Sequence, residues 1–314
     1  MKKGRIRWAV VVALAVAGGA LSASAGEAPA APPTAASAQG GALDTQEIER
    51  LTGAKGELSA KEGVFKVSVP RTELQVSVAG VKMSPRLGLT SWAAFSRAGD
   101  QTMVMGDLVL LEEQVNPVMD VALANGLEVT ALHNHFFWDS PKVMFMHIGG
   151  MGEQHQLAAA VGKVFTRIKE TSGGRGSVPR VSIDPAKSTL DKVRLDTVLG
   201  TQGDLKDGVY KAAFGRVTRM HGHDVGNAMG VNTWAAFAGS NERAVVDGDF
   251  AVLESELQPV LKALRAANIH IVAIHNHMTG EEPRVLFLHY WGVGPAAELA
   301  RGVRSALDQT AISR

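Results

Sequence analysis

The sequence contains no cysteine among its 314 residues. This absence excludes disulfide bonds, thiolate metal ligands, a cysteine nucleophile and a lipid-modified N-terminal cysteine. Aromatic residues are also scarce, at 5%, whereas glycine occurs 34 times. That composition suits a turn-rich α+β protein better than a helical bundle.

Long runs of like charge are absent too. Lysine and arginine total 32 against 31 aspartate and glutamate, for a formal net charge of +1. Non-specific nucleic-acid binding depends on clustered positive charge, so we expect no nucleic-acid partner. With 46% hydrophobic and 20% charged residues, the chain can bury a substantial core.

The apolar run at residues 8–20 is too short to span a bilayer comfortably. Four basic residues precede it, and the small residues Ala23, Ser24 and Ala25 follow it. This pattern predicts a cleaved secretory signal peptide over residues 1–25, with an uncleaved anchor as the alternative. We therefore expect a periplasmic or secreted protein, with no membrane span after cleavage and a flexible linker over residues 26–45.

Several catalytic sequence motifs are missing as well. No G-x-G-x-x-G segment follows a predicted strand, and no phosphate-binding loop is present. The G-x-S-x-G elbow of the α/β-hydrolases and the H-E-x-x-H motif of metalloproteases are also absent. These absences give no support to a dinucleotide enzyme, a hydrolase triad or a helical zinc protease.

The main feature that is present is an internal duplication. A shift of 142 residues aligns residues 88–150 with residues 230–292 without a gap, and 22 of the 63 positions are identical. Random overlap at this composition would give about 4. Upstream the offset becomes 145, which indicates one small loop difference. We interpret the chain as two fused copies of one domain, over residues 46–170 and 197–312, with a linker over residues 171–196.

Hydrophobic periodicity predicts the same elements in both copies. In copy one, strands are predicted over residues 64–69, 74–78, 103–111, 128–135 and 142–148, and helices over residues 113–124 and 152–169. Strands outnumber helices, and a short loop joins the last two strands as a hairpin. This order predicts an α+β fold of two tandem copies, each a mostly antiparallel sheet with two helices.

Three histidines recur at matched positions in each copy. In a strand, residues i and i+2 face the same side, and the third histidine lies in the partner strand of the hairpin, within roughly 5 Å when opposed. Three converging imidazoles suit a divalent ion with one open position, and zinc is the metal we predict. A hydrogen-bonded polar cluster is the alternative. The predicted ligands are His133, His135, His147, His275, His277 and His289.

Four matched carboxylates are further candidates. Asp107 and Asp249 each follow a glycine, for which turn chemistry is the simpler interpretation and acid–base catalysis the alternative. Glu112 and Glu254 begin a predicted helix, where the helix dipole favours a carboxylate. As functional groups they would orient a histidine N–H.

The repeated W-A-A-F segment contains Trp92 in copy one and Trp234 in copy two. The simplest interpretation is that both tryptophans are core residues. A platform on which a ligand stacks is the alternative.

Several stretches resemble the LppY/LpqO family, and the resemblance extends from about residue 47 to residue 307. It implies a bacterial envelope protein of unknown function. Mycobacterial members are lipoproteins, and this chain departs from them because it has no cysteine. The stretches are P-R-T-E-L at 70–74, W-A-A-F at 92–95, M-G-D-L-V-L-L-E at 105–112, V-T-A-L-H-N-H at 129–135, F-M-H-I-G-G at 145–150, M-G-V-N-T-W-A-A-F-A-G-S at 229–240, I-V-A-I-H-N-H-M at 271–278 and F-L-H-Y-W-G at 287–292.

The histidine pattern is also similar to the metal site of acetolactate decarboxylase-like domains and of plant and prokaryote conserved (PPC) domains. Three hypotheses follow from this pattern. The first is a metal-dependent enzyme that acts on a small or envelope-derived polar substrate. The second is a non-catalytic protein that binds a metal ion or a cell-envelope ligand. The third is a structural protein whose histidines form polar networks in the core.

Overall fold

The computed structural model describes residues 41–172 and 179–312 of the chain. The predicted signal peptide, residues 1–25, lies outside the described residues, as does most of the linker predicted over residues 26–45. Among the described helices, none combines the length and the apolar character that crossing a membrane would require.

Each repeat contains a short first helix, a run of strands, a second helix, a hairpin and a third helix. The α+β class and the tandem duplication predicted from the sequence are confirmed. Repeat one consists of α1 (Thr45–Thr52), β1 (Gly56–Ser59), β2 (Val64–Pro70), β3 (Ser77–Val78), β4 (Val81–Lys82), β5 (Thr90–Ala98), β6 (Gln101–Leu111), α2 (Glu112–Ala124), β7 (Glu128–His133), β8 (Asp139–Ser140), β9 (Val143–Gly152) and α3 (Gln154–Thr171).

Repeat two follows the same order, with a β-ribbon where repeat one has β3 and β4. It consists of α4 (Lys192–Leu199), β10 (Asp204–Lys206), β11 (Val209–Gly215), β12 (Thr218–Met220), β13 (His223–Val225), β14 (Asn232–Gly239), β15 (Ala244–Leu253), α5 (Glu254–Ala266), β16 (His270–His275), β17 (Val285–Gly294) and α6 (Ala296–Leu307).

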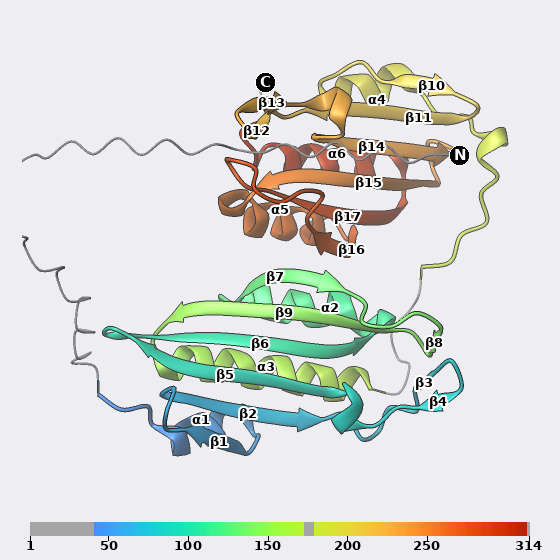
Figure 1. The fold of residues 1–314 in the computed structure, drawn as a ribbon. Helices are drawn as coiled ribbons and strands as arrows, with labels where there is room; N and C mark the ends of the chain where they lie inside the picture. The colour runs from blue at the N-terminus through green and yellow to red at the C-terminus, as the bar shows by residue number, and fades with distance from the viewer. Residues whose placement is uncertain (1–40, 173–178, 313–314) are drawn as a thin grey trace, which may run out of the picture. The chain divides into compact units, whose positions relative to one another are not determined.

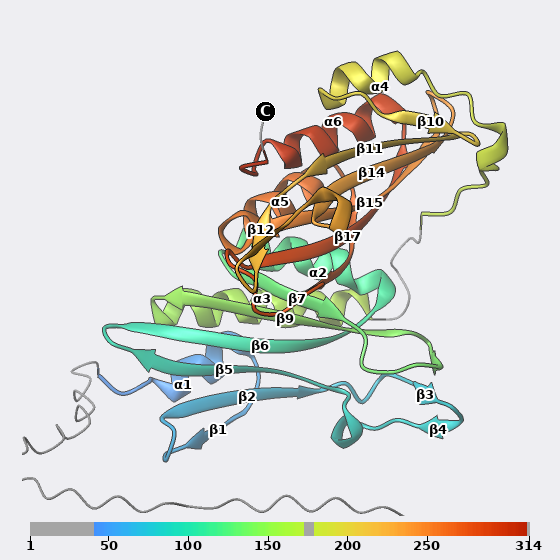
Figure 2. The ribbon, with the colours of Figure 1, turned by 45° about the horizontal axis from the view of Figure 1, so that its top comes forward.

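All neighbouring strands of the main sheet are antiparallel. The strand order is β1-β2-β5-β6-β9-β7 in repeat one and β16-β17-β15-β14-β11-β10 in repeat two. Figure 1 shows α2 and α3 on one side of the sheet of repeat one, and α5 and α6 on one side of that of repeat two. Figure 2 shows β7, β9, β6, β5 and β2 as successive neighbours from a second direction. Among the residues that the structure describes, no α-helix lies on the other face of each sheet, and we call it the open face.

Strand alternation divides each motif between the helix-covered core and the open face. In the W-A-A-F segment of β5, Ala93 and Phe95 are fully buried under the helices, whereas Trp92 points to the open face and is only half-buried. Trp234 in β14 has the same place. The prediction that these two tryptophans are core residues is therefore wrong.

A short helix that the sequence analysis did not predict opens each repeat. In α1 the side chain of Asp44 accepts a hydrogen bond from the amide of Glu47, and Gly53 ends the helix in the left-handed conformation. Asp191 and Gly200 bound α4 in the same way, so this helix begins within the predicted linker over residues 171–196. The aspartate and glycine were the sequence signals for both helices.

Two strands are shorter than predicted. The strand predicted over residues 128–135 ends at His133, because the side-chain amide of Asn134 donates to the Phe136 carbonyl oxygen at 2.9 Å and closes a local turn. The strand predicted over residues 74–78 is reduced to β3, because the Leu74 amide bonds to the Arg71 carbonyl oxygen at 3.3 Å in a turn.

The two repeats join edge to edge through β7 and β16, which pair at Leu132 and Ile274 to give a 12-stranded sheet. These two residues occupy equivalent positions in the duplication, since 132 plus 142 is 274. Both are buried in the core beneath the helices. Equivalent residues therefore face each other across the junction, as in a symmetric dimer interface.

Side-chain amides complete this junction where the strands bulge. Asn116 of α2 donates to the Ile271 carbonyl oxygen at 3.1 Å and accepts from its amide at 2.8 Å. Its counterpart Gln258 of α5 makes the same pair of bonds with Val129, at 2.9 and 3.0 Å. Each bulge frees one backbone N–H and one C=O, and burial without a partner would cost free energy.

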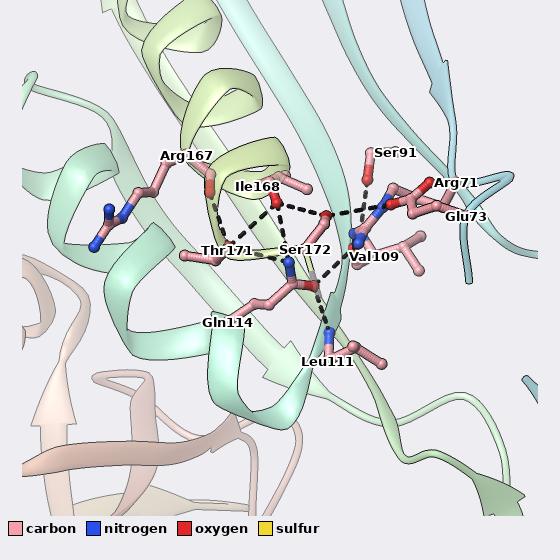
Figure 3. A network of polar contacts seen from close by, with 10 residues as sticks. All are labelled: Arg71, Glu73, Ser91, Val109, Leu111, Gln114, Arg167, Ile168, Thr171 and Ser172. Carbon is pink, nitrogen blue, oxygen red and sulfur yellow. Dashed lines mark hydrogen bonds and ion pairs between the residues drawn. The ribbon is translucent and has the colours of Figure 1, made fainter. Parts of the chain in front are cut away.

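A buried arginine ties the end of β2 to the middle of repeat one (Figure 3). Arg71 is 2% exposed, bonds to the Val109 carbonyl oxygen of β6 and donates to the side chain of Gln114 at 3.0 Å. Gln114 in turn donates to Ile168 and Thr171 of α3, each at 3.0 Å. This network fixes the end of β6 at Val109 and Leu111, just beyond Asp107.

Repeat two replaces the neutral glutamine of this network with a charge. Arg216, the counterpart of Arg71, pairs with Glu256, the counterpart of Gln114, at 2.6 Å. Both side chains are more than nine-tenths buried. Glu256 also accepts hydrogen bonds from the amides of Leu253 and Ala311, at 2.9 and 2.7 Å.

The glycines that precede Asp107 and Asp249 make room for a core side chain. A Cβ on Gly248 would overlap the ring of the fully buried Tyr290 and the Trp234 carbonyl oxygen. The Tyr290 hydroxyl donates to that same oxygen at 3.0 Å. In repeat one, a Cβ on Gly106 would lie 2.9 Å from Ile148. The repeated Gly-Asp pair is therefore a packing requirement within a strand.

We predict that Gly248→Ala lowers the free energy of unfolding by about 1–3 kcal/mol, as overpacking of a filled core does. Gly149→Ala is the matched control, because its Cβ would meet nothing closer than 3.7 Å. Urea denaturation measures both. Equal stability of the two variants would contradict the packing argument.

Candidate functional site

The β7–β9 hairpin brings the histidines of repeat one to the open face. His133 lies opposite Phe145, and His147 lies opposite Ala131, so that His133 and His147 are diagonal neighbours. The β16–β17 hairpin repeats this register with His275 and His289. His135 and His277 follow the end of their strands and are more exposed than the other four histidines.

In repeat two, the three histidines form a compact cluster. His275, His277 and His289 each offer one ring nitrogen, and these nitrogens all lie within 4.8 Å of one another. The His275 ring centroid is 5.1 Å from that of His277 and 5.0 Å from that of His289. Within the part of the chain that the structure describes, this is the one group of three or more potential ligands that meets this distance.

Repeat one brings its histidines together less completely. The Nε2 atoms of His133 and His147 are 3.0 Å apart, and the rings of His133 and His135 are 5.1 Å apart between centroids. Two ligands of a tetrahedral ion are separated by roughly 3.3–3.4 Å. The pair His133 and His147, at 3.0 Å, is slightly closer than this spacing, and the triad with His135 does not close as it does in repeat two.

Two contacts orient the rings in both repeats. The second histidine of each H-N-H segment stacks on a buried phenylalanine: His135 on Phe145 at 3.3 Å and His277 on Phe287 at 3.5 Å between centroids. Nδ1 of the first histidine lies 3.3 Å from the carbonyl oxygen of the next residue, Asn134 or Asn276. With Nδ1 as the donor of this bond, Nε2 carries the free lone pair, as in metal-binding histidines.

The two site aspartates lie beside these rings, in the middle of strands. Asp107 of β6 is directly opposite His147, and Asp249 of β15 is directly opposite His289. An Asp107 oxygen lies 4.0 Å from His147 Nε2, and an Asp249 oxygen lies 3.6 Å from His277 Nε2. The interpretation of these aspartates as turn residues is therefore wrong, because the preceding glycine serves packing and not a turn.

Each aspartate keeps one oxygen buried without a hydrogen-bond partner. Asp249 is 3% exposed, and this burial raises its pKa to about 7. Burial, followed by the like charges of His275 and His289, lowers the pKa of His277. A neutral imidazole is the form that binds metal ions.

The glutamate candidates lie elsewhere. Glu112 and Glu254 are exposed at the first residues of α2 and α5, and Glu254 lies 3.6 Å from Arg284. Over the described ranges, no hydrogen bond or ion pair joins either glutamate to a site histidine.

Sequence analysis did not single out two further pairs of residues near the histidines. Phe145 and Phe287 support the exposed histidines, and Lys66 and Lys211 extend over Trp92 and Trp234 on the open face. The signal was available, since all are identical between the repeats. Only the strand register shows that they share a face with the site.

A model of one protein family matches the chain twice, over residues 46–167 and 193–309. The chain belongs to the family described as Domain of Unknown Function (DUF1259). Each matched segment of this DUF1259 chain contains one set of three histidines and one site aspartate. No curated protein matches the chain.

The arrangement in repeat two has the components of a metal-assisted acid–base site. It combines three nitrogen ligands, a carboxylate that can gain or lose a proton near neutral pH, and one solvent-exposed ligand, His277, on the open face. Repeat one has the same residue types, but among the described residues only the repeat-two histidines offer three ring nitrogens within 4.8 Å of one another.

The buried Asp249 predicts a pH-dependent stability of the metal-free protein. Its ordinary pKa is 3.8 and its folded pKa is about 7, so the folded state binds the extra proton between these values. The free energy of unfolding should therefore fall as pH rises through this window, by up to about 4 kcal/mol. Asp249→Asn cannot ionise and should lose this dependence, as measured by urea denaturation in EDTA at pH 5 and pH 8. The exposed Asp100→Asn should behave as wild type; a constant offset between Asp249→Asn and wild type would contradict the argument.

Proposed function

We propose that this protein is a divalent-metal-dependent enzyme whose principal site is His275, His277 and His289, with zinc as the ion. One observation carries the proposal: three ring nitrogens lie within 4.8 Å of one another beside a buried aspartate with an unpartnered oxygen. A buried carboxylate that lacks a partner costs free energy, and it is typical of a site that awaits a ligand.

The residues present fit such an ion. Imidazole ligands without sulfur suit zinc, and the chain offers no cysteine that would compete. An ion held by the three histidines would supply Lewis acidity toward a carbonyl or phosphoryl oxygen. Asp249 lies on the same face at 3.6 Å from His277, where it would accept a proton from the substrate and return it.

The two repeats differ in how closely their histidine ring nitrogens are arranged for binding an ion. The three ring nitrogens of the repeat-two triad lie within 4.8 Å of one another. Repeat one offers the pair His133 and His147 at 3.0 Å, while His135 stacks on Phe145. We therefore propose that repeat two binds the ion more tightly, and that repeat one binds a second ion after rotation of His135.

We also propose the finer family assignment and the location. The paired motifs resemble the LppY/LpqO family, and residues 1–25 have the pattern of a secretory signal peptide. The substrate would then be a small or envelope-derived polar molecule in the periplasm or outside the cell.

Zinc binding tests the metal proposal. In equilibrium dialysis at pH 7.5, the first equivalent of zinc should be lost in His277→Ala, and the second and weaker one in His135→Ala. Occupancy should fall as pH drops through about 6.5, because protonated imidazole does not bind metal. The exposed His221→Ala in repeat two is the control and should keep both equivalents. Retention of the first equivalent by His277→Ala, or no zinc uptake by wild type, would refute the proposal.

The alternative is a non-catalytic metal-binding protein, which the exposure of His277, 38% for the side chain, favours. Hydrolysis of p-nitrophenyl acetate by the zinc-loaded protein separates the two functions. If the protein is an enzyme, Asp249→Asn should retain zinc and lose about 10²–10⁴ in kcat, as expected for a missing general base. Absence of zinc-dependent turnover in wild type would favour the binding protein.

A further inference from the structure

A strip of side chains that are identical in the two repeats crosses the open face. Six neighbouring position pairs on this face differ: Ser68/Ala213, Ser96/Ala238, Met103/Val245, Met105/Asp247, Gly149/Trp291 and Met151/Val293. Both copies keep the contiguous row while these neighbours have diverged. The identical pairs are Lys66/Lys211, Trp92/Trp234, Ala94/Ala236, Asp107/Asp249, His147/His289, Ala131/Ala273 and His133/His275.

The strand register places the members of the strip side by side. Trp92 is directly opposite Asp107, and Asp107 is directly opposite His147. Trp234, Asp249 and His289 have the same register in repeat two. Neighbouring strands are about 4.8 Å apart, so the tryptophan and the histidine lie roughly 10 Å apart with the aspartate between them.

A lysine ammonium is held at the tryptophan end of each strip. Lys66 Nζ lies 4.1 Å from the centre of the Trp92 ring, and Lys211 Nζ lies 4.3 Å from that of Trp234. Across residues 41–172 and 179–312, no carboxylate lies within 4.0 Å of either ammonium. The aromatic face holds each ammonium in place without neutralising its charge, which leaves it available to an anion.

The aspartate in the middle of each strip lacks a donor. One oxygen of Asp107 and one of Asp249 are buried without a hydrogen-bond partner, and Asp249 is 97% buried since its exposure is 3%. Leaving such an oxygen unpaired is unfavourable, because it loses its hydrogen bonds to water on burial. A ligand hydroxyl would supply the missing hydrogen bond.

We propose that each strip binds a small hydroxylated anion, a polyol that carries a carboxylate or a phosphate. The lysine ammonium pairs with the anionic group, the aspartate accepts a hydrogen bond from a hydroxyl, and an oxygen at the far end reaches the ion held by the histidines. Only this last contact depends on the proposed metal function. The strip thus selects a substrate that carries an anionic group at one end and hydroxyl groups along its length.

The repeats should differ in affinity. Asp247 occupies the position that is Met105 in repeat one, and it faces Lys211 across Ala236. A carboxylate so near the ammonium competes with the ligand anion. Repeat one should therefore bind the anion more tightly, and Asp247→Met should strengthen binding in repeat two.

Fluorine NMR of the 5-fluorotryptophan-labelled protein tests the proposal, with the resonances assigned by Trp→Phe variants. Gluconate and glycerol 2-phosphate are the anionic probes, which separate carboxylate from phosphate, and sorbitol is the neutral control. The resonances of Trp92 and Trp234 should shift with at least one anion and not with sorbitol.

Lysine variants locate the contact. Lys66→Met should weaken the response of Trp92 about tenfold or more and leave Trp234 unchanged, and Lys211→Met should do the reverse, since a charged hydrogen bond contributes about 1.5–3 kcal/mol. Exposed Lys82→Met is the control and should change neither response. Equal responses to sorbitol and the anions, or unchanged responses in both lysine variants, would overturn the proposal.

The same titration in EDTA separates this proposal from the metal function. Shifts that persist in metal-free protein and depend on Lys66 support the strip, even if dialysis shows no zinc. Zinc binding without any anion-dependent shift at Trp92 or Trp234 would reject the strip and leave the metal proposal standing.

Discussion

Within the described residues, α-helices pack against only one face of each repeat's sheet, and side chains alternate between the two faces along every strand. Core packing and the placement of the site both follow from this arrangement. Where Phe95 enters the core, Trp92 must face outward; where Leu108 is buried, Asp107 lies beside His147. Core and site are thus built from the same strands, residue by residue, and a strand that slipped by one residue would lose both.

Both repeats have this arrangement of sheet and helices, and they differ in the residues that surround the site. The junction pairs Leu132 with its own counterpart Ile274, so both open faces belong to one 12-stranded sheet. Gln114 becomes Glu256 in the buried network at the end of the strand, and Met105 becomes Asp247 beside the strip. The strip is retained in both repeats, whereas its surroundings differ in charge.

Much of this could be predicted from the sequence, because duplication and periodicity are local signals. The helix over residues 113–124 required only the helical spacing of its apolar residues. The hairpin and the shared face of the histidines required only strand alternation and a short loop. The places of Asp107 and Trp92 could not be predicted, because a Gly-Asp pair is typical of turns and a tryptophan of cores. Only the pairing of β6 with β5 on one side and β9 on the other, together with the side on which the helices pack, shows that both residues border the histidines.

We propose that the histidines of repeat two form a metal site with imidazole ligands. Zinc K-edge X-ray absorption of the protein loaded with one equivalent of zinc examines the ligands themselves, because imidazole rings give a characteristic outer-shell scattering. We expect three imidazole nitrogens at about 2.0–2.1 Å with one additional light ligand, and loss of one imidazole in His289→Ala. A shell of oxygen atoms without imidazole scattering, unchanged in that variant, would contradict it.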